Sequence, residues 1–141
     1  MTNWTPVETT THQDHVIAHV LGASVLLKGV PTVVTGPGGE TLVSASGTPA
    51  LATAGSGDVL AGIALTLLAQ TGDSLHSGAC AAWIHGRAAE IANAGRPIRG
   101  VTVGDVVDAL GHAWRLNASP PSAPVLTEIA AAVEYREEAL E

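Results

Sequence analysis

Apolar residues recur at helical spacing over residues 16–21, and they are Val16, Ile17, Val20 and Leu21. Gly22 follows them, and glycine is the residue that most often ends a helix in the left-handed conformation. Residues 1–11 are polar and rich in threonine, which indicates a lead-in to the folded part. The pattern therefore predicts a first helix that ends at Gly22.

Three short apolar runs follow and indicate strands. The run over residues 24–28 has no polar alternation, which is typical of a strand buried on both faces. Residues 30–35 and 41–44 form the second and third runs. The glycine- and proline-rich sequence of residues 36–39 lies between them and predicts a β-hairpin.

The next part of the chain has helical periodicity. Helices are expected at about residues 57–70, 75–94 and 103–116. The second helix carries a stripe of small residues, which would let a neighbouring helix approach closely. The stripe comprises Ala79, Ala82, Trp83, Gly86, Ala89 and Ala92.

Side chains that can cap a helix precede the second and third of these helices. Asp73 or Ser74 is expected to cap the second helix, and Thr102 the third. The apolar face of the third helix is expected to comprise Val106, Val107, Leu110 and Trp114.

The C-terminal part begins with a proline-rich stretch. Residues 119–124 predict a linker, and residues 125–141 predict a last amphipathic helix. Three short strands followed by four helices indicate an α/β protein, but they are too few to make a sheet covered on both faces. The strand layer therefore looks incomplete.

Composition narrows the class of protein. Of the 141 residues, 46% are hydrophobic and 13% charged, which indicates one compact domain and excludes a disordered chain. The net charge of −7 argues against nucleic acid as a partner, because phosphate backbones need Lys and Arg. An anionic ligand would have to be held by backbone N–H groups and a few local cations.

Cys80 is the only cysteine, so no internal disulfide can form and a reducing compartment is expected. Its apolar neighbours predict a small buried residue rather than a nucleophile. Neither a signal peptide nor an apolar stretch long enough to cross a bilayer is recognised. We expect a cytoplasmic protein that does not enter the membrane.

The six histidines show no metal-ligand spacing. His85 lies on the small-residue helix, where a packing or hydrogen-bonding role is expected. His12, His15 and His19 would share a solvated helical face. Arg96 and Arg99 flank a proline in what reads as a surface loop, although a phosphate contact there stays open.

A loop of small residues opens the helix expected near residue 57. Gly55 and Gly57 bracket Ser56 and would let the backbone turn tightly and approach a ligand. The first N–H groups of a helix have no partner within it, so such a turn can hold phosphate. Asp58 would lie beside that phosphate. The alternative is that Ser56 or Asp58 only caps the helix.

Several motifs together resemble the carbohydrate-kinase-like NAD(P)H-hydrate dehydratase family of the ribokinase-like superfamily. The resemblance covers about residues 23–110, and the block at residues 52–62 is its most specific part. The motifs are Leu26-Leu27-Lys28-Gly29, Thr32-Val33-Val34, Gly47-Thr48-Pro49, Ala52-Thr53-Ala54-Gly55-Ser56-Gly57-Asp58-Val59-Leu60-Ala61-Gly62 and Ile84-His85-Gly86-Arg87-Ala88-Ala89.

This resemblance implies that residues 1–118 are the C-terminal half of a ribokinase-like fold, with short strands and a hairpin followed by a helical layer. The family's domain is about twice this length, so the N-terminal half, which supplies most of the substrate pocket, would be a missing partner. Either the chain is a piece of a larger enzyme, or another chain supplies the missing layer. A homo-oligomer is also expected.

The resemblance also assigns roles to residues. Asp58 would contact the substrate and act as the catalytic base, while the backbone N–H groups of Gly55, Ser56 and Gly57 would form an anion hole. Gly57 would also contact the nucleotide. The nucleotide-binding segment, for ADP or AMP, would be Lys28, Gly29, Val30, Pro31 and Thr32, although Pro31 lacks a backbone donor.

The implied reaction is repair of hydrated NADH or NADPH. ADP would phosphorylate the hydroxyl of the hydrated nicotinamide ring, and loss of phosphate would restore the dihydronicotinamide. Mg²⁺ would bridge the phosphates, but no strong ligand cluster for it is visible in the sequence. Two alternatives remain: a kinase for a vitamin precursor or sugar, and a non-catalytic fragment that contacts nucleotide or mediates oligomerisation.

Overall fold

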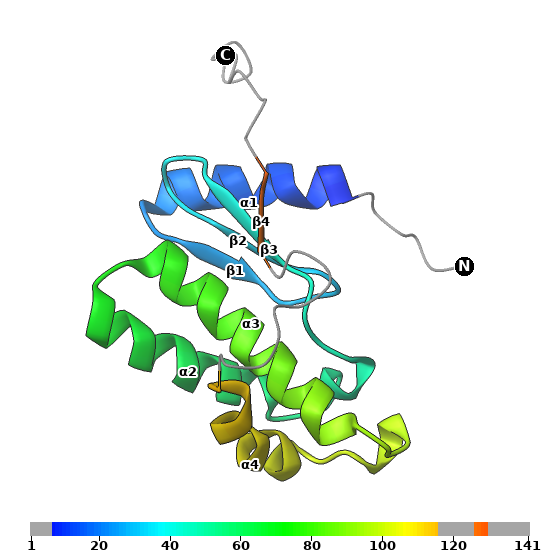
Figure 1. Cartoon of the computed structure of the whole chain (residues 1–141). Helices are drawn as coiled ribbons and strands as arrows, with labels where there is room; N and C mark the ends of the chain where they lie inside the picture. The colour runs from blue at the N-terminus through cyan, green and yellow to red at the C-terminus, as the bar shows by residue number, and fades with distance from the viewer. Residues whose placement is uncertain (1–6, 116–125, 130–141) are drawn as a thin grey trace.

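A small β-sheet lies between helices in the computed structural model, which describes residues 7–115 and 126–129 (Figure 1). Short strands with a hairpin come first along the chain, and a helical layer follows. The α/β class expected from the sequence is confirmed. Within the described residues, no helix has the length and apolar character needed to cross a membrane.

The helices cover the two faces of the sheet. Helix α1 (Val7–Leu21) packs on one face and helix α3 (Ser74–Asn93) on the other (Figure 1). Helices α2 (Ser56–Thr71) and α4 (Val103–Ala113) pack against α3 on its side away from the sheet. Helix α1 begins at Val7, inside the stretch expected to be a lead-in, and ends before Gly22 as predicted.

The sheet is antiparallel throughout, with its strands in chain order. The hairpin predicted at residues 36–39 is confirmed, and the Gly36 N–H donates to the Glu40 carbonyl at 2.8 Å. The strand before the hairpin begins two residues later than expected, because the chain bends over residues 29–31. The strands are β1 (Val25–Leu27), β2 (Thr32–Thr35), β3 (Thr41–Ser44) and β4 (Leu126–Ile129).

The C-terminal helix predicted over residues 125–141 is wrong where the structure describes it. Residues 126–129 form β4, which pairs with β3 from Leu126 opposite Ser44 to Ile129 opposite Thr41. The open backbone edge of β3 provides hydrogen-bond partners that a pattern within the segment cannot reveal. The rest of the predicted helix and the linker at 119–124 lie outside the described residues.

Strand β1 is not buried on both faces, contrary to expectation. Val25 and Leu26 are half-buried and Leu27 is 39% exposed. Among the described strands β1 pairs only with β2, so one of its edges is uncovered. Its continuous apolar sequence is therefore suited to more neighbours than this chain supplies.

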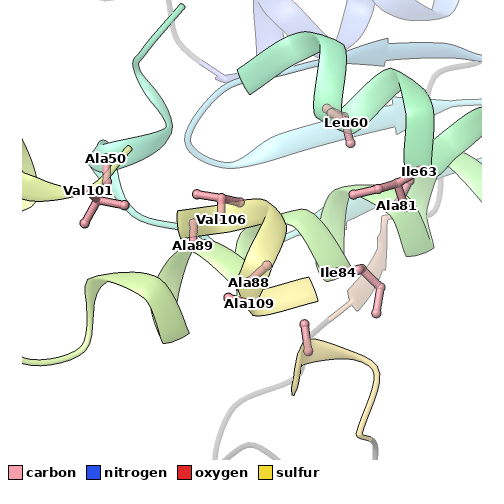
Figure 2. Packing of buried hydrophobic residues seen from close by; sticks show 11 residues of the cluster. Ala50, Leu60, Ile63, Ala81, Ile84, Ala88, Ala89, Val101, Val106 and Ala109 are labelled. Atoms are coloured by element: carbon pink, nitrogen blue, oxygen red, sulfur yellow. The ribbon is translucent and has the colours of Figure 1, made fainter. Parts of the chain in front are cut away.

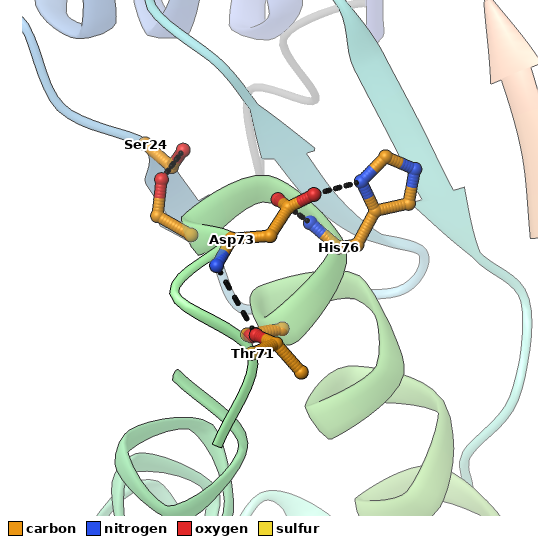
Figure 3. Close-up of polar contacts among 6 residues, drawn as sticks. Ser24, Thr71, Asp73 and His76 are labelled. Carbon is orange, nitrogen blue, oxygen red and sulfur yellow. Dashed lines mark hydrogen bonds and ion pairs between the residues drawn. The ribbon is translucent and has the colours of Figure 1, made fainter. Parts of the chain in front are cut away.

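Local signals placed the end of α2 and the starts of α3 and α4 within one residue, whereas α4 ends at Ala113 and not at about residue 116 as expected. Gly72 ends α2 in the left-handed conformation, and its N–H donates to Leu68 O at 2.8 Å. The Asp73 carboxylate caps α3 by accepting the His76 N–H at 3.0 Å (Figure 3). Thr102 caps α4 in a reciprocal capping box.

The main core lies where α3 meets α2 and α4 (Figure 2). Small side chains of α3, including Ala81 and Ala88, let the neighbouring helices approach closely. The predicted apolar face of α4 is only partly right, because Val107 and Trp114 are exposed. Cys80 is also exposed rather than buried. The buried residues of α4 are Val106, Ala109 and Ala113.

Candidate functional site

A pocket of about 260 Å³ lies beside α3, where the chain that leaves β1 meets the chain that leaves β3. Small residues make most of its wall. Among the described lining residues Lys28 is the one cation at neutral pH, and none is a carboxylate. An acidic chain therefore keeps a locally positive pocket, as an anionic ligand requires. The lining comprises residues 28–32, residues 45–49, Leu51, Ala52, Ala82 and His85.

The predicted nucleotide-binding segment forms one side of this pocket. The Lys28 ammonium donates to Leu51 O at 3.1 Å, which ties the end of β1 to the short helix η1 (Pro49–Leu51). The Thr32 hydroxyl donates to Gly29 O at 3.2 Å and accepts the Gly29 N–H at 3.3 Å. Gly29, Val30, Pro31 and Thr32 are thereby held as a compact turn along the pocket. The structure brings all five predicted residues together.

His85 lines the same pocket and is only 2% exposed. Burial, and then the positive charge of Lys28, lowers the pKa of His85 to about 4, so its ring is neutral at pH 7. Its Nε2 has no hydrogen-bond partner among the described residues. The sequence predicts packing or hydrogen bonding for His85, but it does not reveal the position of His85 beside Lys28. Only the fold brings these two residues together.

The loop before α2 makes a tight turn, as predicted. Gly55 has φ +83°, a left-handed conformation that favours glycine, and α2 begins at Ser56. No side chain caps this helix. Ser56 Oγ is buried without a partner in the described part of the chain, and Asp58 is exposed. The alternative that Ser56 or Asp58 only caps the helix is therefore wrong.

The backbone donors of this turn differ in availability. The Ser56 N–H already donates to Thr53 O at 3.3 Å, while Asp58 N–H donates to Gly55 O at 3.1 Å. Within residues 7–115 and 126–129, the N–H groups of Gly55 and Gly57 have no acceptor. Two of the three predicted anion-hole donors are thus available for a ligand.

The structure does not merge the loop and the pocket into one cavity. Gly55, Ser56, Gly57 and Asp58 are not among the described residues that line the pocket. The two parts are consecutive, because η1 and Ala52 line the pocket and lead directly into the turn. No group of three acidic, histidine or cysteine side chains that could hold a metal occurs in the described part.

Comparison with known proteins identifies the family. The sequence profile of the NAD(P)H-hydrate dehydratase family, a carbohydrate-kinase family, matches residues 7–111. The chain belongs to this family. The match includes the pocket, the turn before α2 and both helices that pack on α3.

Curated relatives of the dehydratase family share close to half of the aligned residues. An ADP-dependent (S)-NAD(P)H-hydrate dehydratase of Neisseria meningitidis serogroup B is 46% identical over 95 residues, which is 66% of this chain and 32% of the relative. A bifunctional NAD(P)H-hydrate repair enzyme Nnr of Salinibacter ruber is 46% identical over 85 residues, 60% of this chain and 16% of the relative. The chain therefore spans a third or less of these relatives.

Solved structures of the family have the same fold. The ADP/ATP-dependent NAD(P)H-hydrate dehydratase of Bacillus subtilis, co-crystallised with ATP/Mg²⁺ and soaked with CoA, superposes with a TM-score of 0.71 at 28% identity. The superposition covers 76% of this chain and 40% of that enzyme. The chain thus has part of this ribokinase-like fold, as the resemblance implied.

Proposed function

We propose that this chain is the C-terminal part of an ADP-dependent NAD(P)H-hydrate dehydratase. The observation that carries the proposal is the uncapped, exposed start of α2, where Asp58 stands beside the unused N–H groups of Gly55 and Gly57. A base and an anion site then lie in one helical turn. Family membership gives this arrangement its reaction.

Asp58 is the proposed catalytic base and substrate contact. As ADP transfers its terminal phosphoryl group to the hydroxyl of the hydrated ring, Asp58 takes the proton from that hydroxyl. The helix N-terminus favours an ionised carboxylate, which is a weak base in the ground state. Proton transfer late in the reaction suits it, because the hydroxyl becomes acidic as the new P–O bond forms.

The turn around Gly55, Ser56 and Gly57 is the proposed anion hole. Its unused N–H groups would donate hydrogen bonds to the transferring phosphoryl group, which would also lie at the positive end of the α2 dipole. AMP leaves first. The ring nitrogen's lone pair then expels phosphate from the phosphorylated carbon, and the resulting iminium ion loses a proton from the neighbouring ring carbon. This restores the dihydronicotinamide, so the products are AMP, phosphate, a proton and NADH or NADPH.

The pocket beside α3 is the proposed site for part of the nucleotide. Lys28 and the turn of Gly29, Val30, Pro31 and Thr32 supply its cation and polar edge. Its 260 Å³ is below the roughly 300–1,000 Å³ of a complete small-molecule site. It can therefore enclose only part of ADP, and further surface must complete the site.

Mg²⁺ is the proposed companion of the nucleotide. The described residues offer no cluster of metal ligands. This agrees with the general behaviour of Mg²⁺ at phosphates, which is held chiefly by phosphate oxygens and water. Mg²⁺ would neutralise charge on the phosphates, and Asp58 would remain available as base.

The missing N-terminal half of the domain is the proposed main partner. Leu27 and Leu65 are exposed, and the outer edge of β1 is unpaired within the described sheet. An uncovered strand edge and exposed leucines indicate an unfinished surface. Assembly as a homo-oligomer and a cytoplasmic location remain predictions.

The test is a pair of turnover assays on the complete protein that contains this segment. One assay supplies ADP, Mg²⁺ and hydrated NADPH, and the other supplies ATP, Mg²⁺ and small alcohols such as sugars and vitamin precursors. We expect recovery of NADPH with release of AMP and phosphate in the first assay only. Phosphorylation of an alcohol without NADPH repair would replace the proposal with a small-molecule kinase.

A further inference from the structure

A second part of the pocket wall, beside the turn at residues 28–32, is a stretch of chain with no regular structure. It runs over residues 45–48, between the end of β3 and η1, and all four residues line the pocket. A segment without regular hydrogen bonding needs other contacts to keep one conformation. Its contacts with α3 therefore decide the shape of the pocket.

Two serines attach the first part of this wall. The Ser46 hydroxyl donates to the Trp83 carbonyl of α3 at 3.0 Å. Because that proton is used, the Ser44 hydroxyl must donate to Ser46 Oγ, also at 3.0 Å. Gly86 lets the wall approach, since a Cβ there would lie 2.5 Å from the Ser46 carbonyl group. The wall thus rests directly on the α3 backbone.

Glu90 of α3 holds Gly47, the residue that follows Ser46 in the wall. Its Oε1 accepts the Gly47 N–H at 2.8 Å, and its other oxygen forms an ion pair with Arg87 one turn earlier on α3. Gly47 has φ +131°, a conformation that other residues rarely adopt. A carboxylate acceptor makes this bond stronger than a bond between neutral groups. Glu90 is not among the described residues that line the pocket.

We propose that Glu90 is a positioning residue of the nucleotide pocket, which holds the wall of residues 45–48 through the Gly47 N–H. This rests on the proposed function, because it takes the pocket as a nucleotide site. Glu90 touches no ligand in this proposal and acts through the backbone that it fixes. Thr48 and Pro49, which begin η1, keep their place because Gly47 keeps its conformation.

The direction in which ADP affinity changes when the Glu90 carboxylate is removed distinguishes a positioning role from a purely electrostatic one. A carboxylate near an anion site repels phosphate, so removing its charge should by itself strengthen ADP binding. Loss of a positioned wall should weaken binding, because only the fraction of molecules with the correct wall can bind. The two explanations predict opposite changes for the same substitution.

The experiment uses the 141-residue chain and four variants. Glu90→Ala removes the acceptor, Glu90→Gln keeps an acceptor oxygen without the charge, and Arg87→Met removes only the ion pair. Asp108→Asn removes an exposed charge of α4 and serves as the control. The readouts are amide hydrogen exchange at Gly47, the Kd for ADP with Mg²⁺ from an NMR titration, and the thermal unfolding midpoint.

We expect Glu90→Ala to speed Gly47 exchange and to weaken ADP binding, each by about tenfold, since one charge-assisted hydrogen bond is lost. Glu90→Gln should stay within about threefold of the wild type, and Arg87→Met and Asp108→Asn should change neither readout by more than about twofold. Unfolding midpoints establish that each variant is folded at the temperature of the titration.

Three results would overturn the proposal. Unchanged Gly47 exchange in Glu90→Ala would show that the contact does not hold the wall. Faster exchange with unchanged or tighter ADP binding would show that Glu90 matters to the fold but not to the ligand. A Glu90→Gln variant as weak as Glu90→Ala would show that ADP binding does not depend on an acceptor oxygen for the Gly47 N–H. If the wild-type chain shows no saturable ADP binding, the titration is repeated on the complete protein that contains this segment, and a lack of binding there overturns the nucleotide assignment. Gly47 exchange in the 141-residue chain tests the contact between Glu90 and Gly47 in either case.

Discussion

Asp58 combines exposure with a position at the start of a helix that no side chain caps. Among the described residues its carboxylate has no hydrogen bond or ion pair. A residue kept for helix stability would normally bond to the first N–H groups. The structure thus leaves this carboxylate available for a ligand, and its role can be tested separately from folding.

We predict that Asp58→Asn in the complete enzyme lowers kcat by about 10²–10⁴-fold, the usual loss when a general base is removed. The Kd for ADP should stay within about threefold, because the backbone N–H groups and Lys28 are unchanged. Steady-state kinetics and an ADP titration measure the two quantities. Asp108→Asn, an exposed carboxylate on α4, is the control. A kcat near normal would place the base elsewhere.

His85 gives the chain a specific pH dependence. The pKa of His85 falls from its usual 6.5 to about 4 on folding, through burial and then the charge of Lys28. Between these values the unfolded chain binds a proton that the folded chain does not, so stability must fall as pH decreases from 6.5 to 4. The pKa of Asp73 is lowered by hydrogen bonds from His76, and that of Asp105 by bonds with Thr102, so both carboxylates act mainly below this window.

The predicted loss of unfolding free energy from His85 is on the order of 1–3 kcal/mol across this window. Asp14, whose pKa is raised by burial, opposes the trend near the bottom of the window. Urea unfolding at pH 6.5 and pH 4 measures the loss in the wild type and in His85→Gln, which cannot titrate. The variant should lose clearly less stability. Equal losses in both proteins would contradict a neutral buried His85.

Helix α3 packs against the sheet and against α2 and α4, and Gly86 lies at a close contact between α3 and the backbone of Ser46. A Cβ at Gly86 would lie 2.5 Å from the Ser46 backbone, whereas a Cβ at Gly62 on α2 would meet nothing within 4 Å. We predict that Gly86→Ala destabilises the chain by about 1–3 kcal/mol through overpacking. Gly62→Ala should stabilise it by up to about 1 kcal/mol through helix propensity. Urea unfolding measures both, and equal effects would contradict the close contact.

Elements that depend on local sequence could be predicted. Gly72 and Asp73 give the end of α2 and the start of α3, and the hairpin follows from four consecutive turn residues. Elements that depend on distant partners could not. Residues 126–129 become a strand only because β3 has an open edge, and β1 is half-buried because it lies at the edge of the sheet. Neither circumstance is encoded within the segment itself.

The candidate site also combines features that depend on local sequence with features that depend on distant partners. Residues 28–32 and the turn before α2 could be proposed from sequence, because each is a continuous stretch that carries part of the family resemblance. His85 and Glu90 could not, since one meets Lys28 and the other meets Gly47 only after α3 packs beside the chain leaving β3. Helical periodicity places them on a helix but says nothing of these partners.

At the scale of the whole molecule, three features support the proposal that this chain is one part of an enzyme. The chain spans 32% of the Neisseria relative and 40% of the Bacillus subtilis enzyme. The outer edge of β1 is unpaired in the described sheet, and Leu65 of α2 is exposed. The pocket is smaller than a site for a complete nucleotide. If the proposed function holds, a surface for the hydrated nicotinamide ring must come from other residues.

We therefore predict that the purified 141-residue chain has no measurable dehydratase turnover with ADP, Mg²⁺ and hydrated NADPH. The chain keeps the proposed base and anion hole, but positioning the substrate against them accounts for much of an enzyme's rate, and that surface is missing. The full-length Neisseria enzyme in the same assay is the positive control. Turnover by the chain alone, abolished by Asp58→Asn, would show that residues 1–141 already contain a complete active site.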